Sequence, residues 1–186
     1  MTDHTVVSHE EWDAVRKKLL EREKESSKLR EKLTTLRQSL PWEKVQKEYT
    51  FDGPRGKETL ADLFDGKSQL IVYHFMFDPE WKEGCKFSSL ASDFNFDYHV
   101  SFTPEQAEKR ETYYNYRMEN SAGGERPGIS VFYKSENGDI FHTYSSYGRG
   151  LENFIGAYNL LDIVPKGRDE AGLKNGMDWV RRHDQY

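Results

Sequence analysis

The stretch SQLIVYHFMFDPEWKEGC, residues 68–85, decides the fold, because it joins the most apolar segment of the chain to its single cysteine. Residues 69–77 carry apolar side chains on both faces of an extended backbone. This pattern is typical of a strand that lies in the middle of a sheet and is covered on both sides. Cys85 follows shortly after the strand ends, so it is either a reactive thiol or a small buried side chain.

The composition sets the size and the class of the protein. A chain of 186 residues fits one domain with an appendage, and 11 Tyr, 11 Phe and 4 Trp supply much of its apolar area. The net charge of −5, with no isolated basic cluster, argues against nucleic-acid binding. No apolar run is long enough to span a membrane, and the amino end lacks a signal pattern. A single cysteine fits a reducing compartment, so a cytoplasmic location is predicted.

A long helix is predicted over residues 8–40. Ser8 and Glu11 have the spacing of a capping box, and Pro41 ends the helix because proline cannot donate the next hydrogen bond. Arg22 and Ser26 interrupt an apolar 4,3 repeat made of Val15, Leu19, Leu29, Leu33, Leu36 and Leu40. Such a stripe packs either on the chain's own core or on a second copy, and both alternatives stay open. The charged remainder of the helix is interpreted as a solvated face.

The remaining chain reads as a mixture of strands and helices. We therefore predict an α/β protein with a helical arm over 1–41 and a second domain over 42–186. The predicted elements, besides strand 69–77, are a strand at 45–51, a turn at 52–56, an apolar cluster at 60–64, a hairpin at 129–145 that turns at 136–138, and a helix at 151–161.

The order of strand, Gly84-Cys85, Pro127, hairpin and helix is similar to the thioredoxin fold. In that fold a proline, usually cis, begins the hairpin and faces the active-site cysteine. The resemblance implies that residues 69–77 pair with 129–134, and that 129–134 pair with 139–145, in a small mixed sheet.

The chain more closely resembles a family of bacterial and fungal thioredoxin-like proteins grouped as a domain of unknown function. The segments that carry this resemblance keep the family order. They are VVSHEEWDAVRKKLLEREKE, LPWEKVQKEYTFDGPRG, LADLFDGKSQLIVYHFMFDPEWKEGC, SDFNFDYHVSFT, FHTYSSYGRG and MDWVRRHDQY.

The chain departs from the family pattern just after Cys85. Members resemble Gly-Cys-x-x-Cys at this point, followed by a helix, a strand and a second helix. Here Gly84-Cys85-Lys86 leads almost directly to Ser92, so the domain is shortened between residues 86 and 92 and lacks the second cysteine. The loss exposes one edge of strand 69–77, which could pair with a second copy.

The resemblance implies a site around Cys85. Cys85 would be the nucleophile, Pro127 the contact for the substrate backbone, and His74 or His142 a proton carrier, while Trp81 would shape the approach to the thiol. The local motif Cys-x-x-Ser allows a mixed disulfide or a sulfenic acid, so the predicted substrate is a disulfide or a peroxide.

Three other features have competing interpretations. Arg149, between two glycines, could bind an anion or pair with Asp162 or Glu152. Residues 92–98 alternate polar and aromatic side chains, which suits a ligand pocket or an edge segment packed on the core. The histidines, His74, His99, His142 and His183 among them, show no metal-ligand spacing, so no metal and no cofactor is predicted.

Two functions follow from the sequence. The first is a thioredoxin-like oxidoreductase or peroxide-reactive monothiol protein that uses Cys85, with activity weakened or lost through the missing cysteine. The second is a non-catalytic interaction module that forms a homodimer through the helix at 8–40 or the open sheet edge.

Overall fold

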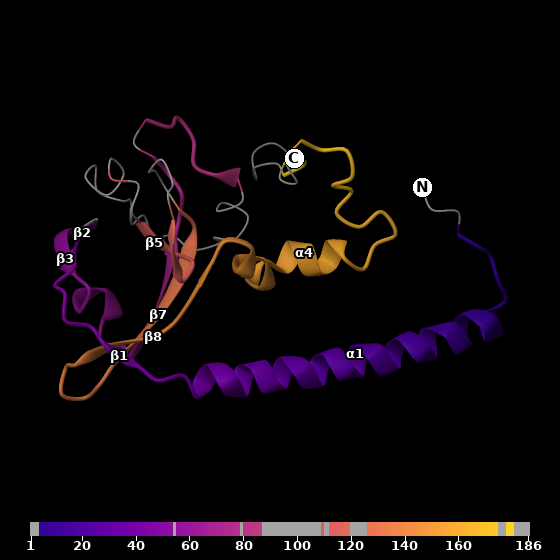
Figure 1. The fold of residues 1–186 in the computed structure, drawn as a ribbon, viewed down its shortest axis with the longest axis horizontal. Coiled ribbons are helices and arrows are strands. Elements are labelled where there is room, and N and C mark those ends of the chain that lie inside the picture. Colours follow the sequence, from indigo (N-terminus) through magenta and orange to yellow (C-terminus); the bar gives the residue numbers. More distant parts are fainter. Residues whose placement is uncertain are drawn as a thin grey trace. The chain divides into compact units, whose positions relative to one another are not determined.

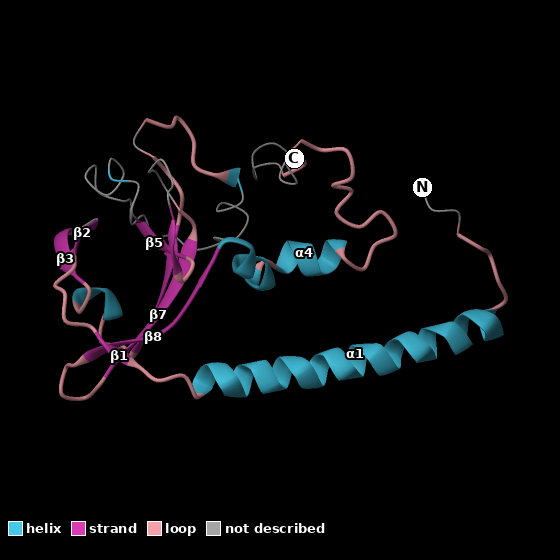
Figure 2. Cartoon of the chain, viewed as in Figure 1, coloured by secondary structure: helices cyan, strands magenta, loops and turns pink. Residues whose placement is uncertain are grey.

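The computed structural model describes residues 4–53, 55–78, 80–86, 109, 112–119, 126–174 and 178–180 (Figure 1). The chain divides into two compact units, Met1–Pro41 and Trp42–Tyr186. The first unit is helical and the second contains the sheets, so the α/β class is confirmed (Figure 2).

The first unit contains one long helix, α1 (His9–Gln38). Its capping box is confirmed: the Glu11 N–H donates to Ser8 Oγ at 3.2 Å, and the Ser8 N–H donates to Glu11 Oε2 at 3.0 Å. These hydrogen bonds stabilise the carboxylate and lower the pKa of Glu11. The helix ends at Gln38, two residues before the predicted Leu40, with Ser39 as the carboxyl cap.

The second unit is built on a four-stranded sheet with the order β1-β8-β7-β4. Its strands are β1 (Glu43–Lys44), β4 (Gln69–His74), β7 (Gly128–Lys134) and β8 (Ile140–Tyr147). β4 pairs with β7, and β7 with β8, as the sequence predicts. All pairs are antiparallel, so the expected mixed sheet is not observed in the described part of the chain.

Two small hairpins complete the strands. β2 (Thr50–Gly53) pairs with β3 (Gly56–Thr59), and β5 (Thr112–Tyr114) pairs with β6 (Arg117–Glu119). Asn115 and Tyr116 link the second pair with positive φ angles of 53° and 62°. A two-residue connection of this kind matches the twist of the strands that it joins.

The prediction of a strand over 45–51 is wrong for residues 45–49 and holds only for Thr50 and Phe51, which begin β2. β1 ends at Lys44, where the ammonium group pairs with Asp139 at 2.8 Å, and the Val45 N–H adds one bond to the Ile140 carbonyl at 2.9 Å. Trp42 anchors this edge by packing on Tyr133 and Phe141. The chain turns away after Val45, and the next strand begins only at Thr50.

The helix predicted at 151–161 is divided in two. A 3₁₀ helix, η2 (Gly148–Phe154), is followed by α4 (Gly156–Leu161). Ile155 between them has an extended backbone, with φ −100° and ψ 104°, and its side chain is buried. The break therefore lets Ile155 enter the core, where the fully buried side chains also include Phe64 of η1 (Asp62–Phe64), Leu151, Tyr158 and Val180.

The turn between β7 and β8 gives a test of this fold. Gly138 has φ +89°, and nothing lies within 4 Å of where a Cβ would be. We expect Gly138→Ala to lower the free energy of unfolding by about 1 kcal/mol, purely from backbone strain. Gly156→Ala is the control, because it fills open space at the start of α4 and is expected to be neutral or stabilising. Urea denaturation measures both free energies of unfolding, and equal decreases in the two variants would contradict the assigned turn.

Candidate functional site

The loop after β4 folds back and returns Cys85 to the end of that strand. The Cys85 N–H donates to the Met76 carbonyl at 2.9 Å, two residues beyond His74. Gly84 makes this approach possible, because a Cβ there would lie 2.4 Å from Cε1 of Phe75. Cys85 is half-buried, and as the single cysteine of the chain it forms no disulfide within it. Its position is therefore fixed by the strand rather than by the length of the loop.

The pairing of β4 with β7 brings Pro127 to the same end of the sheet. His74 and Gly128 form the last pair of the ladder, and Pro127 immediately precedes Gly128. The described residues contain no cis peptide bond, so the bond between Arg126 and Pro127 is trans, in contrast to the usual thioredoxin proline. Cys85 and Pro127 thus both lie just beyond the His74–Gly128 pair.

Tyr114 ties this end of the sheet together, and the sequence analysis did not identify it. Its hydroxyl donates to the Pro127 carbonyl at 2.7 Å and accepts from the Gly148 N–H at 3.2 Å. One side chain therefore connects the start of β7 to the end of β8. The available signal was the Tyr-Asn-Tyr sequence at 114–116, because Asn tolerates the left-handed conformation that a tight hairpin turn requires.

His74 is a largely buried histidine on β4. Burial lowers its pKa to about 4, and the nearby charge of His142 contributes to the shift. Its Nε2 lies 3.3 Å from the hydroxyl of Ser130. The ring is therefore neutral at pH 7 and can share a hydrogen bond there, but it is a weaker base than an ordinary histidine.

His142 lies elsewhere on the sheet. It pairs with Phe132, four residues along β7 from Gly128, and its ring packs against that side chain at 5.4 Å. Its Nε2 is buried and has no hydrogen-bond partner among the residues that the model describes. The sheet register thus groups Cys85, Pro127 and His74 at one end and puts His142 in the other half of the hairpin.

Two further residues predicted for the site, Trp81 and Arg149, lie outside the strands of the sheet. Trp81 lies in the loop between β4 and Cys85 and is 42% exposed. Arg149 is the second residue of η2, and its guanidinium pairs with Glu152 at 3.1 Å, which is one of the two partners expected for it. Residues 92–98, His99 and His183 lie outside the described residues.

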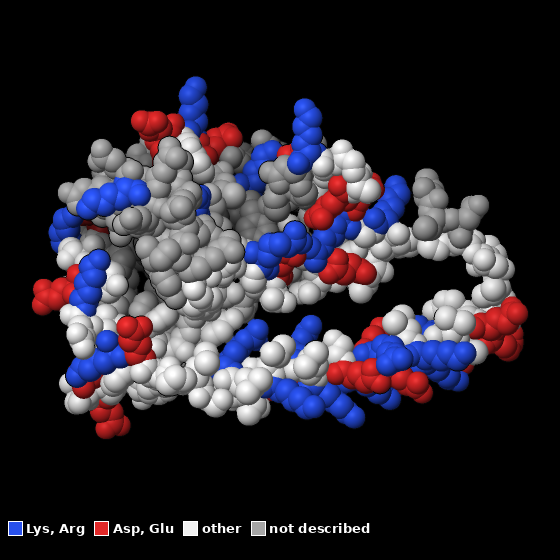
Figure 3. Space-filling model, in the orientation of Figure 1, with Lys and Arg blue, Asp and Glu red and all other residues white. Residues whose placement is uncertain are grey.

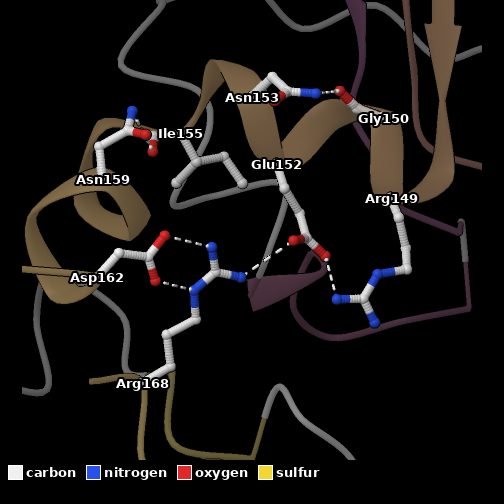
Figure 4. Close-up of polar contacts among 8 residues, drawn as sticks. All are labelled: Arg149, Gly150, Glu152, Asn153, Ile155, Asn159, Asp162 and Arg168. Atoms are coloured by element: carbon white, nitrogen blue, oxygen red, sulfur yellow. Dashed lines mark hydrogen bonds and ion pairs between the residues drawn. The ribbon is translucent and has the colours of Figure 1, made fainter. Parts of the chain in front are cut away.

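A second polar cluster surrounds Arg168, which follows α4 (Figure 4). Its guanidinium donates to both carboxylate oxygens of Asp162, at 2.8 and 2.9 Å, and to Glu152 at 3.0 Å. It also covers the ring of Tyr158 at 4.0 Å. The pairing raises the pKa of Arg168 and lowers that of Asp162. The cluster fastens the segment after α4 to η2, so its role is structural.

The chemistry open to the site is that of a single thiol. No group of three or more His, Cys, Asp or Glu side chains is arranged to hold a metal ion in the part of the chain described above. Among the same residues, no helix combines the length and the apolar character needed to cross a bilayer.

These elements define an α/β protein with one cysteine held at the end of an antiparallel sheet. The chain belongs to the DUF899 family, described as bacterial protein of unknown function, whose model matches residues 1–91 and 86–186. The two matched parts overlap at residues 86–91, which is where the sequence departs from the family pattern. No curated protein and no solved structure matches the chain.

The buried histidine gives a prediction about pH. Between pH 6.5 and about 4 the unfolded chain binds a proton at His74 that the folded chain does not, so stability falls as the pH falls through this window. This loss amounts to up to about 3 kcal/mol. We expect His74→Gln to weaken the pH dependence of urea unfolding between pH 7 and 4.5. An unchanged slope in the variant would contradict the buried, neutral state.

The Arg168 cluster gives a second prediction. Arg168→Lys removes the two-pronged contact with Asp162 and is expected to cost about 1 kcal/mol, since the pair is partly solvated. Arg149→Lys is the matched control, because that side chain is 85% exposed, and it should cost about 0.3 kcal/mol or less. Equal thermal stability of the two variants would argue against a stabilising role for the Arg168 cluster.

Proposed function

We propose that the protein is a monothiol redox protein in which Cys85 forms a mixed disulfide with a substrate. One observation carries the proposal: the hydrogen bond from the Cys85 N–H to the Met76 carbonyl holds the cysteine just beyond the end of the β4–β7 pair, and Pro127 immediately precedes β7 at that same end. A cysteine fixed at a strand end, and only half-buried, is accessible in a way that a core cysteine is not.

The reaction is a thiol–disulfide exchange. The Cys85 thiolate attacks one sulfur of a substrate disulfide, the substrate S–S bond breaks, and the departing half leaves as a thiolate that takes a proton from water. The thiolate of a low-molecular-weight thiol then attacks the substrate sulfur of the mixed disulfide, forms a new disulfide with the substrate, and releases Cys85 as a thiolate. The chain has no second cysteine, so the second thiol must come from outside it.

The neighbouring residues have separate roles in this proposal. Pro127, whose carbonyl is held by Tyr114, contacts the backbone of the substrate beside the thiol. Trp81 covers the approach with an exposed ring, and Arg149 offers an exposed cation to an acidic substrate. His74, which is neutral and lies near the Ser130 hydroxyl at the same end of the sheet as Cys85, is the candidate proton carrier, whereas His142 lies in the other half of the hairpin.

A second candidate function is a non-catalytic interaction module. The observation that favours it is the edge of the sheet: β4 is the last strand in the described order, and Ile71 on it is 65% exposed. An exposed apolar edge strand is a surface on which another strand can add.

The thiol proposal is tested with glutathione disulfide as the probe. We expect the folded protein to form the mixed disulfide at least about tenfold faster than the same chain unfolded in urea, because the fold holds the thiol at the end of the sheet where Pro127 and Trp81 are proposed to position the substrate. Intact mass spectrometry over time measures both rates. Cys85→Ser should form no adduct. Gly84→Ala keeps the thiol but forces Phe75 aside, and should reduce the rate of the folded protein.

A folded protein that reacts no faster than the unfolded chain would remove the case for a functional thiol. If Gly84→Ala keeps its fold, as judged by circular dichroism, and forms the mixed disulfide at the wild-type rate, the geometry of the loop does not matter for the reaction of Cys85.

A further inference from the structure

Helix α1 carries an apolar stripe that is exposed along its whole length. The helix has no buried residue, and Val15, Leu19, Leu29 and Leu36 are all more than half exposed. These residues follow the alternating spacing of the a and d positions of a heptad, with Trp12, 55% exposed, one step earlier in the same series. The apolar stripe forms a seam along most of the roughly 45 Å of the helix, interrupted at Arg22 and Ser26.

The charged residues beside the seam identify its partner. In this heptad the g positions are Glu11, Lys18, Glu25 and Lys32, and the e positions are Arg16, Glu23, Arg30 and Arg37. Figure 3 shows that α1 carries both signs of charge on its surface. We propose that α1 pairs with α1 of a second copy as a parallel, in-register, two-stranded coiled coil.

The parallel arrangement places each g residue beside the e residue of the next heptad on the other copy. Glu11 then faces Arg16, Lys18 faces Glu23, and Glu25 faces Arg30. Each contact occurs twice because the pair is symmetric. Only Lys32 and Arg37, at the end of the helix, bring like charges together. Opposite charges on the two copies therefore face each other along most of the helix.

An antiparallel pair would use the same residues less well. It would bring e positions against e positions, and three of the four are arginines. Because opposite charges at these positions select the orientation of coiled coils, the sequence of α1 favours the parallel form.

Two polar seam positions fix the register of the pair. Arg22 and Ser26 occupy a d and an a position in the centre of the stripe. A polar layer weakens a coiled coil but specifies which residues face each other. In register, Arg22 lies next to Glu23 of the other copy, whose carboxylate can offset the repulsion between the two guanidinium groups.

The ion pairs already present within α1 do not prevent the rearrangement. Arg16 pairs with Glu23, and Arg22 with Glu25, both at 2.9 Å. All four side chains are at least 39% exposed, and such surface pairs contribute little stability. Exchanging them for contacts between copies therefore costs little.

The first test is the mass of the full chain in solution. We expect sedimentation equilibrium up to about 100 µM to show a monomer–dimer equilibrium, since the seam should support at least micromolar affinity. Leu29→Glu places charges in the seam and should weaken the dimer by at least about a hundredfold. Leu20→Glu is the matched control, because Leu20 is an exposed leucine of α1 outside the seam, and it should leave the dimer intact.

A wild-type chain that stays monomeric throughout this range would overturn the proposal. So would a dimer that survives Leu29→Glu, because its interface would then lie elsewhere, for example on the edge of β4.

The second test determines the orientation without removing apolar contacts. Glu25→Arg and Arg30→Glu should each weaken the parallel dimer, and the double variant should restore it, whereas Glu31→Lys on the outer face should have no effect. Ser26→Cys in a Cys85→Ser background should form a disulfide between copies on mild oxidation, since Ser26 faces its own counterpart only in the parallel register. Failure of both the rescue and the cross-link would refute the parallel coiled coil.

Discussion

The antiparallel pairing of β4 with β7 is the interaction on which the candidate site depends. Six residues of each strand are in register, and the ladder ends at His74 and Gly128. A Cβ at Gly128 would lie 2.9 Å from both His74 Nδ1 and a ring carbon of Tyr147, so only glycine lets these two side chains approach from either side. Because the ladder stops there, the chain is free to turn on both strands at the same level, which is where Cys85 and Pro127 occur.

The surroundings of this ladder are held by polar contacts rather than by a large core. The Tyr114 hydroxyl joins the two ends of the β7–β8 hairpin, and Arg168 fastens the segment after α4 to Glu152 and Asp162. Among the residues that the structure describes, the fully buried apolar side chains come mainly from η1, η2 and α4. The polar contacts matter beside them, because an unmade buried hydrogen bond costs more than a made one contributes.

The sequence was sufficient for the elements with strong local signals. The capping box at Ser8 and the Asn-Gly turn at 137–138 each have a local physical cause and agree with the prediction. The strand predicted over 69–77 is present but ends at His74, and it lies at the edge of the described sheet rather than in its middle. The break at Ile155 and the role of Tyr114 were missed because both depend on contacts with distant segments. The neutral state of His74 was also inaccessible, since burial sets its pKa and periodicity does not measure burial in a strand that is apolar on both faces.

The two proposals concern different units of the chain, so they rest on different interactions. In proteins most of the stability of a helix comes from the packing of an apolar face, and α1, a helix of 30 residues, exposes its apolar stripe. A partner that covers this stripe would therefore add to the stability of the helix. The apolar residues do not identify the partner, because they could pack against any apolar surface. The charges at Glu11, Lys18 and Glu25 do, since they match the arginines and the glutamate of a second α1 only when the two helices run in the same direction.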